Sequence, residues 1–532
     1  MITTKHRTLQ LLMFMLLVGC GQVSAADFTD EINSSTQSFS AGQHVIYEMN
    51  VGMYTSQGTF AAAEDKLKEL HTLGIDIVWL MPIYPRGGGI NSPYAATDFQ
   101  KIKTSYGTLE NLKSFVDKAP TLGMQVWLDW VPNHTATNAA WVTSHPEDDK
   151  KDGSGKFVNP SGYGDVYQLD YSNTALVNAM YDCRNYWIDK AGIDGYRCDF
   201  ISSNAIPATY WKSAVPLIKD YAKSKGKDTF YFLGEGDISS VTRLKTAGFD
   251  YDYAWDFQTA LWKNVGTAAT ASTLKSKATS LVNTSKTLGT ARMLYLTSHD
   301  INWNDGGQTL TSMYGDNRYA LQTLVFTLYG MPMIYNGVEV GGNKKLSYFD
   351  DKTKISWGNP DMKMQNTIRT LCALKHAVPA FHDGLTETEN GSVEFLTVTN
   401  TDNTANARVM AYKRKYGDSE ALVILSLATE DLQVKVAGIT AGDYELCLDS
   451  KTIKDGVGKT PATLAATSTV SIEKKGYQVY VLGGVKTGIG SVQTAAAPIL
   501  RADAPRYNLA GQRVGNDYRG IVIQNGRKFV VK

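Results

Sequence analysis

Short runs of β-branched and aromatic residues alternate with helical patterns from about residue 45 to residue 378. The pattern in 61–73 places Leu67, Leu70 and Leu73 on one apolar stripe, and 109–122 has the same helical spacing. Strands that alternate with helices are typical of βα units around a parallel sheet. The strand-like runs are 44–48, 75–80, 125–131, 192–199, 230–234, 251–255, 293–297 and 332–335. Eight such units predict an α/β fold, a (β/α)8 TIM barrel, within 40–382.

The spacing of these runs predicts one insertion in the barrel. A barrel of about 250 residues has roughly 31 residues in each βα unit. Glu235 follows Asp199 by 36 positions, about one unit, and Asp300 follows Glu235 by 65 positions, about two units. Asp199 follows Asp129 by 70 positions, although their strands are successive, so the surplus is an insertion after the third strand. We place it in 134–170, rich in Gly, Asp, Asn and Tyr, as a small subdomain over the carboxyl ends of the strands.

Beyond residue 382 the pattern changes to strands without helices. Alternating apolar and polar positions predict an antiparallel β-sandwich over 383–485. The segment 486–505 is rich in Gly, Ala, Ser and Thr, as linkers are, and 506–532 predicts a short β tail. The predicted strands of the sandwich are 393–398, 408–413, 421–427, 432–436, 444–448, 470–472 and 478–482.

The first 25 residues have the pattern of an export signal. Lys5 and Arg7 precede an apolar run over 11–18, which is too short to span a bilayer. The run that ends in Gly19 and Cys20 resembles a bacterial lipobox, which implies cleavage before Cys20 and an acyl anchor on its thiol. We therefore expect an exported protein of the cell envelope, an outer-membrane lipoprotein facing the periplasm or the surface. The alternative is ordinary cleavage after Ala25, which would release a secreted protein.

Charge and composition narrow the class of partner. Lys and Arg total 53 against 52 Asp and Glu, a formal net charge of +1, which gives no reason to expect a nucleic acid or a polybasic membrane surface. A neutral ligand fits this balance better, and 29 Tyr and 10 Trp supply flat rings that could contact it. The four cysteines after Cys20 match no zinc pattern, and we expect none to be bridged: Cys183, Cys198, Cys372 and Cys447.

Four polar clusters stand where barrel strands are predicted to end. Barrel enzymes place their reacting groups at the carboxyl ends of the strands. Each cluster alone is weak, since an Arg near an Asp is more often a structural ion pair, but together they lie in register with the barrel. The clusters are 129–134 (DWVPNH), 195–199 (GYRCD), 234–236 (GEG) and 298–300 (SHD).

Two carboxyl groups on adjacent strands suit the cleavage of an acetal. Retaining glycosidases use a pair about 5 Å apart, one as nucleophile and one as acid/base. Asp199 and Glu235 meet this requirement on strands four and five. Arg197 points to the same side of its strand as Asp199 and would keep that carboxylate ionised, while burial and negative neighbours would raise the pKa of Glu235. Asp300 would grip sugar hydroxyls.

These clusters resemble the four signature regions of the α-amylase family of retaining glycoside hydrolases, over about 45–378. Further matches are 92–99 (SPYAATDF), 106–108 (YGT), 168–171 (QLDY) and 330–339 (GMPMIYNGVE). The resemblance implies that Asp199 is the nucleophile, Glu235 the acid/base and Asp300 the transition-state stabiliser. It also implies that the ring of Tyr94 stacks on the sugar and that three further residues contact the substrate: Arg197, His134 and His299.

The resemblance also implies the substrate: starch, maltooligosaccharides or related α-glucans, cut at α-1,4 bonds by an endo-acting α-amylase. The alternatives are an α-glucosidase, a cyclomaltodextrin hydrolase or a glucanotransferase of the same family. A starch-binding surface protein that has lost catalysis is a further alternative, which the three carboxyl groups disfavour. A metal-dependent hydrolase is weaker still, because His134 and His299 are the strand-end histidines and no His-x-His pair occurs.

The sequence departs from the starch-cleaving members of the family at two positions. Lys and His typically follow the nucleophile by three and four residues, and Ser202 and Ser203 stand there instead. The Lys touches the leaving sugar and the His helps to hold calcium. Asn133 matches a calcium ligand of the family, so a structural calcium stays open, although no cofactor is required for the chemistry. The tail over 506–532 resembles C-terminal tails of exported proteins of Bacteroides-like bacteria.

Overall fold

The computed structural model describes most of the chain between residues 41 and 531. The described residues are 41–485, without 161, 238–241, 243, 245, 266–270, 289–290, 305–306, 383–390 and 454–455, together with 506–507, 513–515, 519–524 and 527–531. Within them, no helix has the length and apolar character needed to cross a membrane. The predicted export signal with Cys20 and the predicted linker 486–505 lie outside the described residues.

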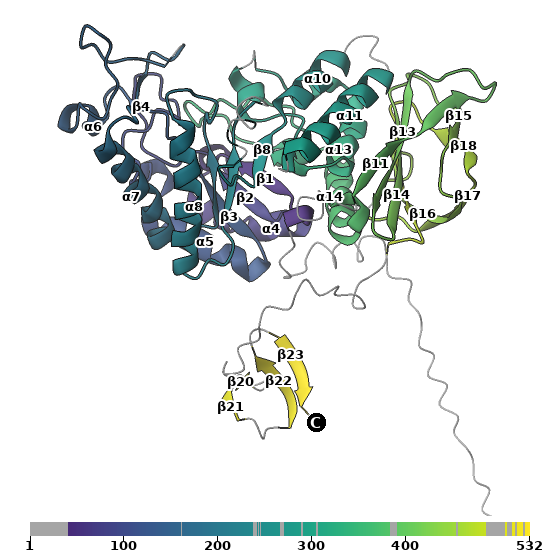
Figure 1. The fold of residues 1–532 in the computed structure, drawn as a ribbon. Helices are drawn as coiled ribbons and strands as arrows, with labels where there is room; N and C mark the ends of the chain where they lie inside the picture. The colour runs from purple at the N-terminus through teal and green to yellow at the C-terminus, as the bar shows by residue number, and fades with distance from the viewer. Residues whose placement is uncertain are drawn as a thin grey trace, which may run out of the picture. The chain divides into compact units, whose positions relative to one another are not determined.

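Eight parallel strands close into a barrel, as predicted, and each lies in or beside a predicted run (Figure 1). Their residues are almost all buried, because helices cover the outside of the barrel, and this burial explains why the strands are continuous apolar runs. The barrel closes where β1 pairs with β10, with Ile46 opposite Met333. In chain order the strands are β1 (Ile46–Met49), β2 (Ile77–Leu80), β3 (Gln125–Trp130), β6 (Gly195–Cys198), β7 (Tyr231–Gly234), β8 (Tyr251–Tyr253), β9 (Ala291–Leu294) and β10 (Met331–Tyr335).

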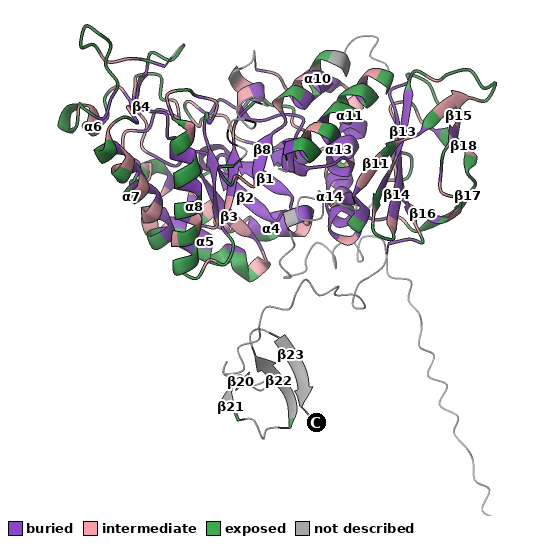
Figure 2. Cartoon of the chain, viewed as in Figure 1, coloured by how far each residue is buried: buried purple, intermediate pink, exposed green. Residues whose placement is uncertain are grey.

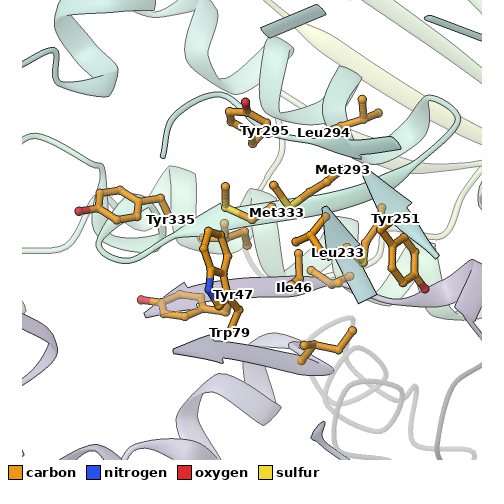
Figure 3. Packing of buried hydrophobic residues seen from close by; sticks show 14 of the residues in the cluster. Ile46, Tyr47, Trp79, Leu233, Tyr251, Met293, Leu294, Tyr295, Met333 and Tyr335 are labelled. Atoms are coloured by element: carbon orange, nitrogen blue, oxygen red, sulfur yellow. The ribbon is translucent and has the colours of Figure 1, made fainter. Parts of the chain in front are cut away.

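Large aromatic and aliphatic side chains fill the space inside the barrel and beneath the helices. Trp79, Trp127, Trp130, Trp187 and Trp211 are fully buried, so half of the tryptophans serve packing. Figure 3 shows part of this core, where side chains of β1, β2 and β10 converge with those of β7, β8 and β9. In Figure 2 the buried colour covers most of the barrel strands, while the outward faces of the surrounding helices are exposed.

The two helices predicted at 61–73 and 109–122 each form in two pieces. α3 (Phe60–Glu64) and α4 (Leu67–Leu73) are separated by a tight turn in which Lys66 N–H donates to the carbonyl of Ala63. α5 (Leu109–Lys118) continues as the 3-10 turn η3 (Ala119–Leu122), which has a proline in its first turn. The larger remaining helices are α7 (Thr174–Ala191), α8 (Ala208–Ser224), α10 (Trp255–Val265), α11 (Ala271–Leu288), α13 (Asn317–Thr327) and α14 (Met362–Ala377).

The insertion follows β3, as predicted. β4 (His134–Ala136) and β5 (Val166–Gln168) form a two-stranded antiparallel sheet, with His134 opposite Gln168, and α6 (Ala140–Ser144) lies between them in the chain. Ala136 and Val166 belong to a small apolar cluster with Ala95 and Ala139. The insertion therefore packs against the loop that follows β2, which carries Tyr94.

The segment after the barrel forms the predicted antiparallel sheets, a six-stranded and a three-stranded one. The prediction of one strand over 393–398 is wrong, because β11 (Ser392–Phe395) and β12 (Thr397–Asn400) belong to different sheets and the buried Leu396 stands between them. β17 (Thr460–Leu464) was not predicted. The other strands are β13 (Val409–Tyr416), β14 (Ser419–Ser426), β15 (Leu432–Ala437), β16 (Gly442–Asp449), β18 (Thr467–Ile472) and β19 (Tyr477–Leu482).

The barrel and these sheets form one compact unit that ends at Val485. Arg414 of β13 is buried and donates to the carbonyl of Thr327 (2.7 Å) and to that of His382 (2.8 Å). Tyr477 and Thr367 join β19 to α14 through their hydroxyl groups, 2.8 Å apart. Polar contacts to helix ends and side chains therefore reinforce the apolar contact between the two parts.

The tail is a separate unit with a small sheet of its own, in the strand order β21, β20, β22 and β23. Its strands are β20 (Arg506–Tyr507), β21 (Arg513–Val514), β22 (Gly520–Gln524) and β23 (Arg527–Val531). The four described cysteines are buried and free.

Candidate active site

The four polar clusters meet at the carboxyl ends of the barrel strands. Asp129 lies at the end of β3, Asp199 and Glu235 directly follow β6 and β7, and Asp300 follows β9. Parallel strands of a closed barrel bring these ends to one face, so residues up to 171 positions apart, such as Asp129 and Asp300, belong to one site. Asp300 opens a π-helical turn, η4 (Asp300–Asn304), a rare element that is frequent at functional sites.

Arg197 of β6 joins three carboxyl groups. Its side chain is 0% exposed, and Nη1 lies 3.0 Å from Oδ1 of Asp129 and 2.9 Å from Oδ1 of Asp199. Nη2 lies 3.0 Å from Oε2 of Glu235, and Nε donates to the Tyr253 hydroxyl at 3.2 Å. The fork of one guanidinium therefore holds Asp199 and Glu235 side by side, in reach of one sugar ring.

Burial and charge set the protonation of the two carboxyl groups. Burial raises the pKa of Asp199 to about 6, and the charge of Arg197 opposes this rise. Burial raises the pKa of Glu235 to about 7; Arg197 opposes the rise, whereas the negative charges of Asp199 and Asp300 add to it. The carboxyl group of Glu235 thus keeps a proton to a higher pH than that of Asp199. Arg197 limits the pKa of Asp199 but does not bring it down to an ordinary value.

The backbone after β6 takes a left-handed turn that serves Glu235. Phe200 has φ of 49°, which is unfavourable for a residue with a Cβ, and its N–H donates to Oε2 of Glu235 at 2.9 Å. Ser203, at one of the two positions that depart from the family pattern, bonds locally, since its Oγ accepts from the N–H of Ala205 at 3.2 Å. The replacement of the family's Lys and His by Ser202 and Ser203 therefore places a serine-rich turn next to the site.

On the other side of the site, a histidine links Asp300 to Tyr94. His299 Nε2 lies 3.3 Å from Oδ2 of Asp300 and 2.9 Å from the Tyr94 hydroxyl. The rings of Tyr94 and His299 are stacked, with centroids 5.2 Å apart and planes at 22°. The Tyr94 hydroxyl also donates to Oδ2 of Asp129 at 3.1 Å, and the guanidinium of Arg197 lies 5.6 Å from the centre of its ring.

His134 binds the backbone of the loop that carries Tyr94. Its Nε2 donates to the carbonyl of Tyr94 at 3.2 Å, and its Nδ1 accepts from the side-chain amide of Asn133 at 3.1 Å. Burial lowers the pKa of His134 to about 4, so the ring is neutral at physiological pH. The structure thus brings together all seven residues of the sequence prediction, with His134 in contact with the backbone of the stacking residue.

The oxygens of Asn133, where the sequence leaves a structural calcium open, accept hydrogen bonds from the protein itself. The side-chain oxygen accepts from Nε2 of Gln168 at 3.0 Å, and the carbonyl accepts from the same nitrogen and from the N–H of Leu169. Among the described residues no group of three or more His, Cys, Asp or Glu could hold a metal ion. A cation bound to Asn133 would therefore have to displace these N–H donors, an arrangement that does not suit an oxygen-ligated calcium ion.

Two important members of the site were missed by the sequence analysis. Asp129 was quoted only as part of a cluster, yet it is fully buried and accepts from Trp79 Nε1 (3.2 Å), Tyr94 and Arg197. Glu48 lies on β1, in none of the four clusters, and contacts His299. A signal for Glu48 was present, because a charged residue within a strand of apolar and aromatic residues is unusual unless it has a partner.

The model of the α-amylase catalytic domain matches residues 22–158 and 161–373, which include every residue of this site. The chain belongs to the α-amylase family of glycoside hydrolases. The barrel described above thus corresponds to the catalytic domain of that family.

Relatives within the family cover most of the chain. α-Amylase MalA of Haloarcula japonica is 24% identical over 80% of this chain, and the chain spans 61% of its length. Cyclomaltodextrin glucanotransferase of Klebsiella oxytoca is 22% identical over 90% of this chain and 85% of its own. The maltogenic α-amylase AmyB of Thermotoga neapolitana has a similar fold, with a TM-score of 0.67 and 21% identity over 83% of this chain and 99% of its own.

Proposed function

We propose that this protein is an exported, endo-acting α-amylase that hydrolyses α-1,4-glucosidic bonds of starch-like α-glucans and maltooligosaccharides with retention. The observation that carries the proposal is the contact of one buried guanidinium, that of Arg197, with both Asp199 and Glu235. Two adjacent carboxyl groups with different proton affinities are the pair that a retaining glycosidase needs.

Asp199 is the nucleophile in this mechanism. Its carboxylate attacks the anomeric carbon as the bond from that carbon to the leaving oxygen breaks, which forms a covalent glycosyl ester. Arg197 holds the attacking group in place, since its Nη1 lies 2.9 Å from Oδ1 of Asp199. The same cation favours the ionised form of the group that must attack.

Glu235 is the acid/base. Its proton passes to the leaving oxygen in the first step, and in the second step its carboxylate takes a proton from the water that attacks the anomeric carbon and releases Asp199. The raised pKa of Glu235 supports the first role. The N–H of Phe200, 2.9 Å from Oε2, fixes the orientation of the carboxyl group in both.

Asp300, His299 and Tyr94 bind the sugar on which the bond is cut. Asp300 is partly exposed, with 23% of its side chain accessible, and can accept from sugar hydroxyls. Charge-assisted hydrogen bonds of this kind stabilise the oxocarbenium-like transition state when they tighten during the reaction. The ring of Tyr94, half-buried and stacked on His299, offers an apolar face to the same sugar.

The roles are tested by replacing Asp199 by Asn and Glu235 by Gln. We expect both variants to lose almost all cleavage of maltoheptaose, while Glu339→Gln, a change at a buried carboxyl group outside the site, keeps it. Survival of cleavage in both site variants would overturn the assignment. NMR of the first product supports retention if the new reducing end appears as the α-anomer.

Endo action is tested with soluble starch. Rapid loss of iodine staining with little free glucose supports it, whereas immediate glucose release favours an α-glucosidase. Cyclic products favour a glucanotransferase, the activity of the Klebsiella relative, and preferential opening of cyclodextrins favours a cyclomaltodextrin hydrolase. Affinity for maltooligosaccharides without turnover would instead indicate a starch-binding surface protein.

Export and lipid anchoring are proposed from the sequence of residues 1–25. If Cys20 is acylated, the protein made in a bacterial host incorporates labelled palmitate and fractionates with membranes, and Cys20→Ala loses both properties. Release of unlabelled soluble protein by the wild type would favour cleavage after Ala25.

A further inference from the structure

A buried carboxyl group lies beneath the site, on β1. Glu48 is 0% exposed and has as strand neighbours Trp79 of β2 and Tyr335 of β10, two side chains shown in Figure 3. Water cannot compensate a charge at such a position, so a carboxylate there is expected to have a protein partner. Oε1 of Glu48 contacts Nδ1 of His299, while Oε2 has no hydrogen-bond partner in the described part of the chain.

His299 therefore lies between two carboxyl groups. Glu48 contacts one ring nitrogen, and Asp300 lies 3.3 Å from the other, Nε2. If the ring were neutral and donated its single proton to Glu48, Nε2 would present a lone pair to the carboxylate of Asp300. If the ring carries both protons, Nε2–H can donate to Asp300 or to the oxygen of Tyr94, which is 2.9 Å away.

The other groups around His299 include one cation. Arg197 of β6 acts on the ring electrostatically, as does the carboxyl group of Asp129 of β3. The rings of Trp79 and Tyr348 form T-shaped contacts with His299, with centroids 6.2 Å and 5.5 Å from that of the imidazole. Three further neighbours were described above: Glu48, Asp300 and the stacked Tyr94.

We propose that Glu48 is a positioning residue that holds His299 as an imidazolium, so that Nε2–H is directed at Asp300 and at the sugar hydroxyls beside it. The proposal rests on the proposed function, because it assigns Asp300 to sugar binding. Glu48 itself lies behind His299 and acts through it.

The proton affinity of the ring agrees with this geometry. Burial alone lowers the pKa of His299, but the charges of Asp300 and Glu48, with the hydrogen bond to Glu48, outweigh burial and raise it to about 9. The site then has two cations: Arg197, in contact with Asp199 and Glu235, and His299, beside Asp300. Glu48 and Asp300 are the two negative charges next to His299, and one of them is lost without Glu48.

Glu48→Gln tests the proposal, because it keeps the shape and an acceptor oxygen but removes the charge. The first readout is NMR of the protein labelled at its histidine rings with 15N, with the His299 signals assigned by their loss in His299→Gln. In the wild type we expect both ring nitrogens of His299 to carry protons at pH 7.5. In Glu48→Gln we expect the titration midpoint of His299 to fall by about one pH unit or more, because one opposite charge at short range is lost.

The second readout is the pH dependence of kcat on maltoheptaose. We expect Glu48→Gln to lower kcat by about twofold at pH 8, because a midpoint that falls from about 9 to about 8 leaves roughly half of the His299 rings protonated, and KM should change much less. The loss should be smaller at pH 5.5, where His299 regains its proton. A merely structural effect would lower activity equally at both values.

Glu339→Gln is the matched control. Glu339 is also buried and accepts from the Tyr47 hydroxyl through Oε1 and from the N–H of Gly337 through Oε2 at 2.9 Å. In the described part of the chain it forms no hydrogen bond or ion pair with His299. We expect it to leave the His299 midpoint and kcat unchanged. The proposal is overturned if wild-type His299 is neutral at pH 7.5, a result that needs no variant. It is also overturned if Glu48→Gln leaves the midpoint unchanged.

These outcomes are distinct from failure of the proposed function. A wild type that cleaves no α-glucan refutes the function, while the NMR titration still decides whether Glu48 holds the proton on His299.

Discussion

Removal of Arg197 should destabilise the fold through one particular carboxyl group. Breaking a buried ion pair by deleting one partner costs about 3–5 kcal/mol, because a charge is left buried and unpaired. Of the three carboxyl groups that contact Arg197, Asp129 is 0% exposed, whereas Asp199 and Glu235 retain 11% and 17%. We therefore expect Arg197→Met to lose about 3–5 kcal/mol of unfolding free energy at pH 8, chiefly through Asp129.

A second substitution isolates that contribution. In Asp129→Asn the side-chain oxygen can still accept from Trp79 Nε1 and from the Tyr94 hydroxyl, as Oδ2 of Asp129 does at 3.2 Å and 3.1 Å. When Asp129→Asn is added to Arg197→Met, the double variant should regain about 2 kcal/mol or more of unfolding free energy. Asp129→Asn alone should destabilise the protein. The measurement is urea unfolding followed by tryptophan fluorescence. The control is Arg292→Met, which breaks a buried pair with Asp252 (2.9 Å) and which Asp129→Asn should not rescue.

The pH dependence provides a further check. Burial raises the pKa of Asp129 to about 7, against about 3.9 in an unfolded chain, so the folded state retains a proton that the unfolded state has lost. This group's contribution to stability therefore falls as pH rises through that window. Without Arg197 its pKa rises further, and the cost of Arg197→Met should be larger at pH 8 than at pH 5.5. Equal destabilisation by Asp129→Asn in wild type and in Arg197→Met would refute the reasoning.

Three other predictions concern the site and its support. First, kcat/KM should follow a bell-shaped pH profile with its maximum between about 6 and 7, because the pKa of Asp199 is raised to about 6 and that of Glu235 to about 7. Activity falls below this range as Asp199 is protonated and above it as Glu235 loses its proton; a broad plateau from pH 5 to pH 9 would contradict this. Second, Tyr94→Phe removes the hydroxyl contacts with Asp129 and His299 but keeps the ring, and should lower kcat/KM about tenfold or less, as one or two hydrogen bonds of about 0.5–1.5 kcal/mol predict; steady-state kinetics beside Tyr94→Ala, which should be worse, checks this. Third, Gly195→Ala should destabilise the barrel by about 1–3 kcal/mol, because its Cβ would lie 2.7 Å from the carbonyl oxygen of Tyr231, and thermal unfolding measures the loss.

The barrel could be predicted because each of its strands is buried on both faces. Such strands are short and largely apolar runs, as in β2 (Ile77–Leu80) and β10 (Met331–Tyr335). The strand β17 could not be predicted in this way. It pairs with one neighbour at the edge of its sheet, it contains Pro461, and three of its five residues are exposed. An edge strand of this kind lacks the alternation that a buried face imposes.

The candidate site divides along a similar line. Asp199, Glu235 and Asp300 were found because each lies in a short local cluster at the expected end of a strand. Glu48 has no such cluster, and its contact with His299 spans 251 positions of the chain. The raised pKa of Asp199 could not be predicted from the sequence for a different reason. Burial raises it and Arg197 lowers it, and the balance depends on how deeply the closed barrel buries the group.

The closure of the barrel between β1 and β10 also bears on how the protein acquires activity. The first strand pairs with the eighth, so β1 has one of its two neighbours only after residues 331–335 have been synthesised. Contacts between distant parts of a chain form slowly, because the loop between them loses entropy before the contact is made. Glu48 and His299 meet across this closure, and so do Tyr47 and Glu339. In refolding, enzymatic activity should therefore return after most of the helical signal, and its rate should report ring closure of the barrel rather than formation of any single βα unit.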